Sequence, residues 1–266
     1  MATTKNIQSI ERAFEVIELF LDTSQYERSL KEISEAVGLA KTTTFGIVNT
    51  LHHLGYLRQN EETQKYGLSL KFFHLNNALP IQQMISNEVR PLLEHLGHSI
   101  QETVHFAGKT DFQLIYLEKV EQQGSISMNS MVGGRNFLHC TGVGKCLLAY
   151  SNQEEFNIIV SHGLRKLTKN TIDDIPKLLE ELDKVRANGY AVDNEEISIG
   201  LKCMAVPVFS DKERADYAIS ASGFVSRIDH AIANNLYDKL RETSVKLSAR
   251  LFNYNSLNDF PYIPRN

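Results

Sequence analysis

The sequence has little cysteine and no long apolar run. Its 266 residues include three cysteines, an odd and small number that predicts no disulfide framework. Such a chain is expected in a reducing compartment, so we predict a cytoplasmic location. No run of about 18 apolar residues occurs, and we expect no membrane span. An export signal is not expected either, because acidic and basic residues interrupt the apolar core it would need, namely Glu11, Arg12, Glu15 and Glu18.

An excess of positive charge is missing too. Lys and Arg number 28 against 32 Asp and Glu, a net charge of −4, which excludes a protein that binds polyanions through its bulk charge. Hydrophobic residues make up 42% of the chain and charged residues 23%, as in ordinary globular proteins. Because domains commonly span about 100–200 residues, the length favours two domains.

Motifs for metal, phosphate and thiol chemistry are absent as well. His139-Cys140 and Cys146 do not have the paired Cys-x-x-Cys spacing of a structural zinc site. The segment 142–145, Gly-Val-Gly-Lys, lacks the spacing of a phosphate-binding loop. A thiol-dependent enzyme would pair a cysteine with His139 or His162, but no recognised signature surrounds these residues. We therefore expect no metal, no cofactor and no enzymatic activity, and keep the thiol enzyme as an alternative.

The first 69 residues have the pattern of a winged helix-turn-helix domain. Apolar residues recur at gaps of three and four in the first predicted helix, which is typical of an amphipathic helix. A tight turn joins the next two helices, and a β-hairpin, the wing, follows them. The expected elements are helices over 7–21, 29–38 and 41–55, strands over 56–58 and 65–68, and a linker helix over 70–80.

The remainder, residues 81–266, alternates predicted helices and strands, which indicates an α+β domain built on a sheet. Pro91 is expected to kink or split the first of its helices. The expected elements are helices over 84–100, 143–150, 153–161, 173–187 and 229–251, strands over 103–107, 113–120, 125–131, 203–209 and 217–222, and a turn at Gly133-Gly134.

Side chains at the start of the third predicted helix suit contacts with DNA. In a helix-turn-helix, the helix after the tight turn enters the major groove, and its first residues meet base edges. Hydroxyl and ammonium groups bind phosphates and bases there, and a threonine methyl group contacts that of thymine. The predicted DNA-binding residues are Lys41, Thr42, Thr43, Thr44 and Asn49 on the helix, and Arg58 and Lys65 on the hairpin.

A protein-interaction module stays open as the alternative for this domain. Three short helices and a hairpin also build such modules, and a Lys-Thr-Thr-Thr run also makes a polar helix start. Residues 1–75 hold eight Lys and Arg against nine Asp and Glu, a net charge of −1, whereas a DNA-binding domain usually has a basic surface. The acidic residues fall on the first two helices and the hairpin tip, which leaves the start of the third helix free of them.

Ordered motifs occur in both halves of the chain, namely IQSIERA (residues 7–13), LAKTT (39–43), GRNFLHCTGVGK (134–145), GYAVDNEE (189–196), GLKC (200–203) and ISASG (219–223). In this order they resemble the isocitrate-lyase-regulator (IclR) family of bacterial transcription factors, over about residues 6–252. The resemblance implies a winged helix-turn-helix followed by a GAF-like effector-binding domain. It also implies dimers through the DNA-binding domains and tetramers through the effector domains.

One position departs from the family pattern. Where the third helix of the family usually carries an arginine, this chain has Phe45-Gly46. A glycine inside a helix costs up to about 1 kcal/mol relative to alanine, and one contact with a phosphate or base is missing. The departure leaves the operator sequence open.

Polar residues in the second half suit a pocket for a small organic acid. Ser220 and Ser222 stand two apart on one predicted strand, so their hydroxyls face the same side of the sheet. Gly142 and Val143 fall at an expected helix start, where free N–H groups hold a carboxylate. Asp193 beside an anion would accept a ligand hydroxyl or carry a proton. The positions that match the effector pocket of the family are Met128, Gly142, Val143, Asp193, Cys203, Ser220 and Ser222.

A purely structural interpretation of these residues is the alternative to the pocket. From the residues alone, the two serines are equally consistent with ordinary solvent-facing strand positions, and Cys203 with a core position. The resemblance favours the pocket.

Together these expectations describe a DNA-binding transcriptional regulator, expected to be a repressor, whose operator binding is controlled by an effector. Its predicted partners are double-stranded operator DNA, a small-molecule effector and further copies of the chain, in a homodimer and a dimer of dimers, with no membrane partner. A protein-interaction or sensor module without DNA binding is the alternative.

Overall fold

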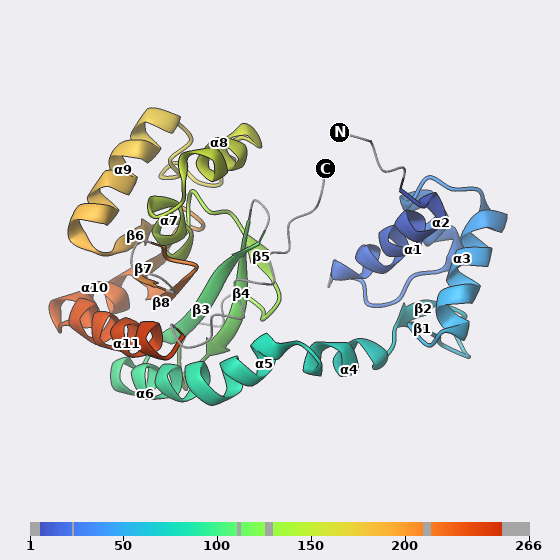
Figure 1. Ribbon diagram of the computed structural model, residues 1–266, viewed down its shortest axis with the longest axis horizontal. Coiled ribbons are helices and arrows are strands. Elements are labelled where there is room, and N and C mark those ends of the chain that lie inside the picture. Colours follow the sequence, from blue (N-terminus) through green and yellow to red (C-terminus); the bar gives the residue numbers. More distant parts are fainter. Residues whose placement is uncertain (1–5, 23, 111–112, 126–129, 210–213, 252–266) are drawn as a thin grey trace. The chain divides into compact units, whose positions relative to one another are not determined.

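The computed structural model describes residues 6–22, 24–110, 113–125, 130–209 and 214–251. The chain divides into two compact units, Met1–Gln82 and Gln83–Asn266, called here the first unit and the second unit (Figure 1). The first unit ends two residues beyond the predicted linker, and the boundaries at residues 69 and 80 stay predictions. Within the described ranges, no helix combines the length and apolar character needed to cross a membrane.

The first unit is a winged helix-turn-helix, as predicted. Helix α2 begins at a capping box, in which Ser29 Oγ accepts a hydrogen bond from the Glu32 N–H and the Glu32 carboxylate accepts one from the Ser29 N–H. It ends before Gly38, whose φ of +65° suits glycine. The elements are α1 (Gln8–Glu18), a 3-10 turn η1 (Leu19–Leu21), α2 (Leu30–Ala36), α3 (Lys41–His53), β1 (Leu57–Gln59), β2 (Tyr66–Leu68) and α4 (Lys71–Asn77).

Helices α1, α2 and α3 share one small core with the hairpin. The hairpin strands pair Leu57 with Leu68 and Gln59 with Tyr66, which brings the apolar side chains of the wing against α3. The core residues are Val16, Phe20, Ile33, Val48, Leu51, Leu57 and Tyr66. By burying one side of α3, this core determines which of its side chains face solvent.

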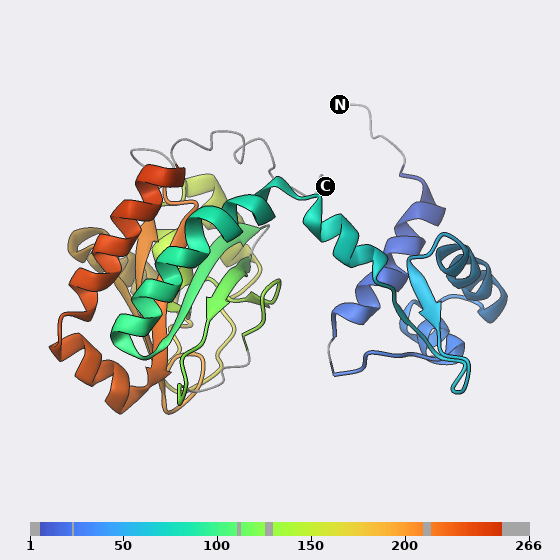
Figure 2. The ribbon, with the colours of Figure 1, turned by 90° about the horizontal axis from the view of Figure 1, so that it is seen from below.

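A six-stranded antiparallel sheet, in the order β5-β4-β3-β8-β7-β6, forms the second unit. Its strands are β3 (Thr103–Thr110), β4 (Gln113–Val120), β5 (Arg135–Asn136), β6 (Ala191–Asn194), β7 (Leu201–Val208) and β8 (Tyr217–Phe224). Helices α6 (Arg90–Ile100) and α11 (Leu236–Leu251) lie side by side over one face (Figure 2). Helix α7 (Gly142–Ala149) packs on the other face, with α9 (Ile175–Asn188) against it. The remaining helices are α5 (Pro80–Met84), α8 (Gln153–Ser161) and α10 (Val225–Ala233).

Several predicted elements differ from the observed ones. The helix predicted over 84–100 is split, with a π-helical turn η2 (Ile85–Val89) between α5 and α6. Pro91 lies in the first turn of α6, where its missing N–H costs no intrahelical hydrogen bond. The prediction of one last helix over 229–251 is wrong, because Asn235, with φ of +63°, stands between α10 and α11.

Strand predictions failed mainly at the edges of the sheet. The strand expected over 125–131 falls largely on residues 126–129, outside the described residues, and Ser125, Ser130 and Met131 are not in a strand. The edge strands β5 and β6 have two and four residues. Runs this short carry too little periodicity to be recognised.

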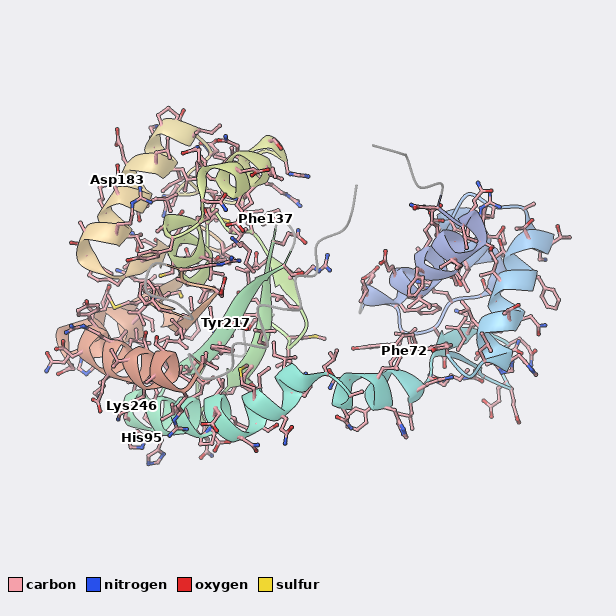
Figure 3. The ribbon with its side chains drawn as sticks, in the orientation of Figure 1. Phe72, His95, Phe137, Asp183, Tyr217 and Lys246 are labelled. Atoms are coloured by element: carbon pink, nitrogen blue, oxygen red, sulfur yellow. The ribbon has the colours of Figure 1, made fainter. Side chains whose placement is uncertain are left out.

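The strand register places polar side chains of four neighbouring strands on the face covered by α7. They are Asp193 on β6, Cys203 on β7, Ser220 and Ser222 on β8, and Thr103 and His105 on β3. We call these six residues the polar row. The opposite face is apolar: Phe106, for example, stacks on Tyr217 with ring centroids 5.0 Å apart. Figure 3 labels Tyr217 in the second unit.

Candidate functional sites

The N-terminus of α3 is open to a ligand. The residue before the helix, Ala40, makes no side-chain cap, and no acidic residue lies in the first turn. Lys41, Thr42 and Thr43 there are exposed. Free N–H groups at a helix N-terminus, together with the helix dipole, attract anions such as phosphate. The neighbouring α2 is different, because Ser29 and Glu32 already occupy its N-terminal N–H groups.

One predicted DNA contact is contradicted. Thr44 is fully buried, and its Oγ1 donates a hydrogen bond to the Ala40 carbonyl at 3.2 Å. Three consecutive helix residues span most of a turn, so Thr42, Thr43 and Thr44 cannot all face outward. Asn49, also predicted, is exposed.

Gly46 stands on the exposed side of α3. A Cβ atom built on it would meet no other atom within 4 Å. The adjacent Phe45 is 51% exposed. The residues in place of the family's usual arginine therefore leave bare helix surface next to an exposed aromatic ring.

Of the two predicted cations of the wing, Arg58 is paired with a carboxylate and Lys65 lies near one. Arg58 Nη1 lies 2.8 Å from Glu27 Oε1 in a half-exposed ion pair. Glu32 has a pKa lowered to about 2, chiefly because its carboxylate accepts the Ser29 N–H hydrogen bond, and Lys65 contributes to the lowering. Contacts of these cations with DNA stay predictions, and each would compete with an acidic neighbour.

The polar row is buried, which contradicts the solvent-facing interpretation of the serines. Ser220 is 1% exposed and Ser222 2% exposed. Ser222 pairs with Cys203 on one side and Thr103 on the other, and Asp193 pairs with Cys203. The predicted effector residues of β6, β7 and β8 therefore meet. Met128, also predicted, lies outside the described residues.

Helix α7 brings Gly142 against this row. A Cβ atom on Gly142 would lie 3.0 Å from Cys203 Sγ and 3.2 Å from the Ala205 Cβ, so glycine allows the helix to approach β7 closely. Val143, next along, is buried. Thr141 caps the helix, its Oγ1 accepting a hydrogen bond from the Gly144 N–H at 3.0 Å.

The cysteines are protonated thiols rather than nucleophiles. Burial raises the pKa of Cys203 to about 11, Asp193 adds to the increase, and hydrogen bonds from Ser222, Ser220 and the Gly142 N–H oppose it. Burial also raises the pKa of Cys140 and of Cys146. A thiol with a raised pKa is a poor nucleophile at neutral pH.

Asp193 is poised between two protonation states. Burial raises its pKa to about 7, and the Glu196 N–H, which donates to Asp193 Oδ1 at 2.8 Å, limits the increase. The carboxyl group therefore carries a proton for part of the time at neutral pH, which allows it to face an anion.

His105 was not among the predicted residues, although the structure places it in the polar row. Its Nε2 lies 2.8 Å from Ser130 Oγ and its ring centroid 5.0 Å from that of Tyr116. Among the described residues, its buried Nδ1 has no hydrogen-bond partner. Burial, with Lys119 nearby, lowers its pKa to about 3, so the imidazole is neutral. The signal was its place two residues after Thr103, on the same side of a strand.

Lys145 is a buried cation whose bonds are used within the protein. Its Nζ donates to Glu196 Oε1 at 2.6 Å, to Glu181 Oε1 at 3.0 Å and to the Val192 carbonyl at 2.6 Å. Although burial alone would lower the pKa of Lys145, the two glutamates raise it. This lysine therefore ties α7 to α9 and β6.

In the part of the chain that the structure describes, no group of three His, Cys, Asp or Glu residues is arranged for a metal.

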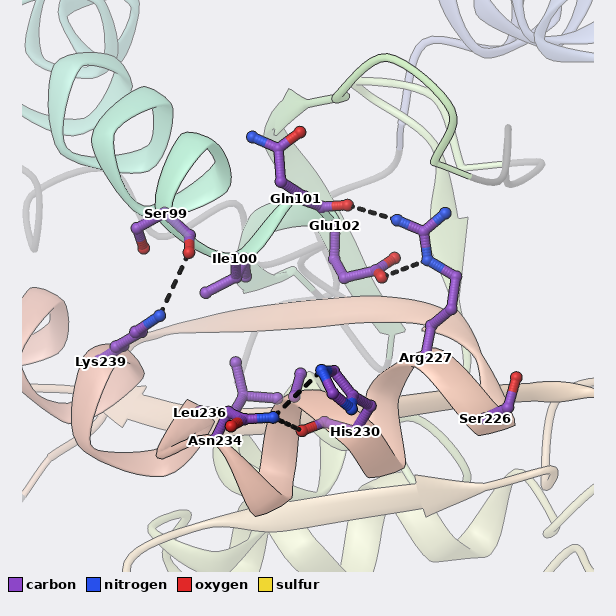
Figure 4. A pocket seen from close by; sticks show the side chains of 11 residues that line it. Ser99, Ile100, Gln101, Glu102, Ser226, Arg227, His230, Asn234, Leu236 and Lys239 are labelled. Atoms are coloured by element: carbon purple, nitrogen blue, oxygen red, sulfur yellow. Dashed lines mark hydrogen bonds and ion pairs between the residues drawn. The ribbon is translucent and has the colours of Figure 1, made fainter.

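A separate pocket of about 440 Å³ lies between the end of α6 and helices α10 and α11 (Figure 4). It contains none of the predicted effector residues. Its guanidinium, Arg227, is already bonded to Glu102 Oε1, the Gln101 carbonyl and the Gly124 carbonyl. Lys239 donates to the Ser99 carbonyl. The cations of this pocket are therefore already bonded within the protein.

Known families match most of the chain. Residues 9–61 match the IclR helix-turn-helix domain, and residues 81–249 match the bacterial transcriptional regulator IclR C-terminal domain. The HTH-type transcriptional regulator XynR of Escherichia coli (strain K12) is 31% identical over 92% of this chain and 97% of its own length. KdgR of the same organism is 30% identical over 97% and 96%. The repressor AllR of Salmonella typhi is 29% identical over 93% and 91%.

Solved structures share the fold. A regulator from Alicyclobacillus acidocaldarius superposes with a TM-score of 0.82 at 24% identity and covers 93% of this chain and 100% of its own. A homolog from Microbacterium hydrocarbonoxydans, complexed with 4-hydroxybenzoate, gives a TM-score of 0.82 at 20% identity, with coverage of 92% and 99%. Both share the fold over nearly the whole chain, which confirms the predicted fold class.

Proposed function

Because this chain belongs to the IclR family of bacterial transcriptional regulators, we propose that it is a repressor whose binding to operator DNA is controlled by a small organic acid. Its relatives are transcriptional regulators, so the expectation that it is not an enzyme is confirmed. We place the regulator in the cytoplasm.

The open N-terminus of α3 is the observation that carries the proposal of DNA binding. Its uncapped first turn and the ammonium group of Lys41 suit a phosphate of the DNA backbone. Thr42, Thr43 and Asn49 are exposed along the same helix and suit base edges. Arg58 and Lys65 would add phosphate contacts from the wing, in which DNA phosphates replace the carboxylates of Glu27 and Glu32 as their acidic partners.

We assign the effector to the polar row. Hydroxyl, thiol and imidazole groups converge there from β3, β7 and β8, and Lys145 is already paired. The carboxylate of the acid would then be held by neutral donors: the N–H groups of Gly142 and Val143 at the positive end of α7, and the protonated carboxyl group of Asp193. The Gly142 N–H would exchange its hydrogen bond to Cys203 for one to the acid. The hydroxyl or carbonyl groups of the acid would meet Ser220, Ser222 and Cys203. Met128 stays a candidate for the apolar floor.

We also propose that the chain works as a dimer and as a dimer of dimers. In the first unit, the apolar side chains of Ile10 and Phe14 on α1, and of Ile7 just before it, are more than half exposed. Exposed apolar side chains in one group favour a protein partner. A dimer would present two copies of α3 to two half-sites of an operator.

Binding to DNA from upstream of the gene, against scrambled DNA, tests the first part of the proposal. Fluorescence anisotropy with the full-length chain should give tight, sequence-selective binding that weakens steeply between about 50 and 200 mM salt, because phosphate contacts release counterions. If the upstream DNA binds no better than scrambled DNA, selection from genomic fragments follows. No binding to any fragment at about 50 mM salt would leave the protein-interaction module as the function of the first unit.

Screening small carboxylic acids in the same assay tests the effector. One of them should release the chain from the operator. If none does, but neutral or cationic metabolites do, the assignment of an organic acid is wrong while the DNA-binding function stands.

A further inference from the structure

The solvent side of α3 has one glycine at its centre. A helix turns by about 100° per residue, so Thr42, Gly46 and Asn49 form a stripe opposite the buried side of the helix. Both side chains of this stripe are exposed. Because residues three and four apart on a helix are neighbours, Gly46 leaves a gap one side chain wide between Thr42 and Asn49.

The gap is open rather than filled from elsewhere. Nothing lies within 4 Å of a Cβ atom built on Gly46. Thr50, which borders the gap, donates its hydroxyl hydrogen to the Gly46 carbonyl at 2.8 Å, so this hydroxyl turns back to the helix. A small apolar group brought against α3 would therefore fit at Gly46 without displacing a side chain.

The helix has few groups that recognise guanine. Paired hydrogen bonds to guanine come most often from arginine, or from lysine. Helix α3 contains no arginine, and its one lysine, Lys41, stands at its first residue. On the wing, Arg58 is paired with Glu27. Asparagine, in contrast, forms paired hydrogen bonds with adenine, and Asn49 is exposed.

We propose that α3 recognises A·T base pairs, with Asn49 hydrogen-bonded to an adenine and the methyl group of a thymine seated over Gly46 beside Thr42. The inference rests on the proposed DNA binding through α3. In this proposal Gly46 helps to determine the operator sequence, and its role is more than the absence of the arginine that the family usually has there.

Removing single methyl groups from the operator tests the inference. An operator is first selected from random double-stranded DNA with the full-length chain, and each thymine of a half-site is then replaced by deoxyuridine, which lacks only the methyl group. At one position per half-site, affinity should fall about fourfold, the effect expected for one buried methyl group. Replacing the A·T pair read by Asn49 with G·C should lower affinity about tenfold or more.

Two variants assign these effects to residues. Gly46→Ala fills the gap with a methyl group of its own and should bind the thymine and deoxyuridine operators equally. Asn49→Ala should lose the preference for A·T over G·C at one position. The control is His53→Ala, exposed at the end of the same helix, which should retain both preferences.

Three results would overturn the inference while leaving DNA binding intact. They are full tolerance of deoxyuridine at every position, unchanged discrimination by Gly46→Ala, and selected half-sites whose required positions are all G·C. Failure of the proposed function itself looks different, because no sequence would then be enriched and no salt-dependent affinity would be found.

Discussion

The candidate DNA-binding face and the candidate effector site are built in opposite ways. The first consists mainly of exposed side chains on one continuous helix of 13 residues. These side chains face solvent because Val48 and Leu51 on the opposite side of the helix are buried in the core. The second gathers buried side chains from four strands, and the buried ion pair of Lys145 with Glu196 lies beside it. A substitution on the exposed helix should therefore change binding with little effect on folding, whereas one near the polar row should change both.

The largest contrast is expected between two ion pairs. Lys145→Met leaves Glu196, which is 4% exposed, without its cation, and should lower the free energy of unfolding of the second unit by about 3–5 kcal/mol. Arg58→Gln breaks the half-exposed pair with Glu27 in the first unit and should cost no more than about 1 kcal/mol. Hydrogen exchange measured by mass spectrometry on the full chain reports each unit separately. Equal losses in the two units would contradict the comparison.

The pH dependence of stability should reveal two buried groups with opposite slopes. The pKa of Asp193 is raised from 3.8 to about 7, so the folded state binds its proton more tightly and stability falls as pH rises through that range. The pKa of His105 is lowered from 6.5 to about 3, so the unfolded state binds more protons and stability falls as pH decreases through that range. Between about pH 4 and 6.5 the two slopes oppose each other.

Single variants separate these slopes. The gain in stability of Asp193→Asn over the wild type should be larger at pH 7.5 than at pH 4.5 by about 3 kcal/mol, because about 2.5 pH units of this interval lie below the folded-state pKa, at 1.36 kcal/mol per unit. His105→Gln should reduce the loss of stability in acid, and the carboxylates with lowered pKa values, such as Glu155, account for the remainder. Urea unfolding across pH measures both changes. Parallel pH profiles for the wild type and Asp193→Asn would show that this carboxyl group is not perturbed.

The effector response should be separable from DNA binding. Ser222→Leu fills the polar row and should abolish release of the operator by the acid found in the screen. Affinity for DNA without effector should stay within about twofold of the wild-type value, because the substitution lies in the other compact unit. Because Ser222 is buried, Ser222→Ala serves as the variant that keeps the fold and loses only the hydroxyl. It should weaken the response about tenfold, the loss expected for one hydrogen bond of roughly 1.4 kcal/mol. An unchanged response in both variants would remove Ser222 from the effector site.

The sequence predicted the first unit well because its information is local. Helix starts, the tight turn and the hairpin lie close together along the chain, and the winged helix-turn-helix follows from them. The error at Thr44 came from the one quantity that local pattern determines poorly, the rotation of α3 about its axis. Val48 and Leu51 define that rotation only once the core is known.

The second unit was harder to predict because strand pairing is not local. Ser220 and Ser222 were recognised as a pair since they share a strand. His105 lies opposite Ser220 only through the pairing of β3 with β8, and Ser130 reaches it from a segment without regular structure. The spacing of Thr103 and His105 places both on one side of a strand, but no spacing encodes their contacts with other strands, so the resemblance to a family supplied most of the predicted site.

The smallest expected effect concerns Gly46, where one substitution should change both folding stability and DNA binding. Gly46→Ala should raise the stability of the first unit by about 0.5–1 kcal/mol, because alanine is the better helix former and its Cβ meets no neighbour. Gly144→Ala in α7 is the matched control and should destabilise the second unit, since its Cβ would clash with the Leu138 carbonyl oxygen. If Gly46→Ala gains stability yet loses affinity for the thymine operator, glycine is retained there for recognition. A gain in stability with unchanged affinity would leave Gly46 without a role in DNA binding.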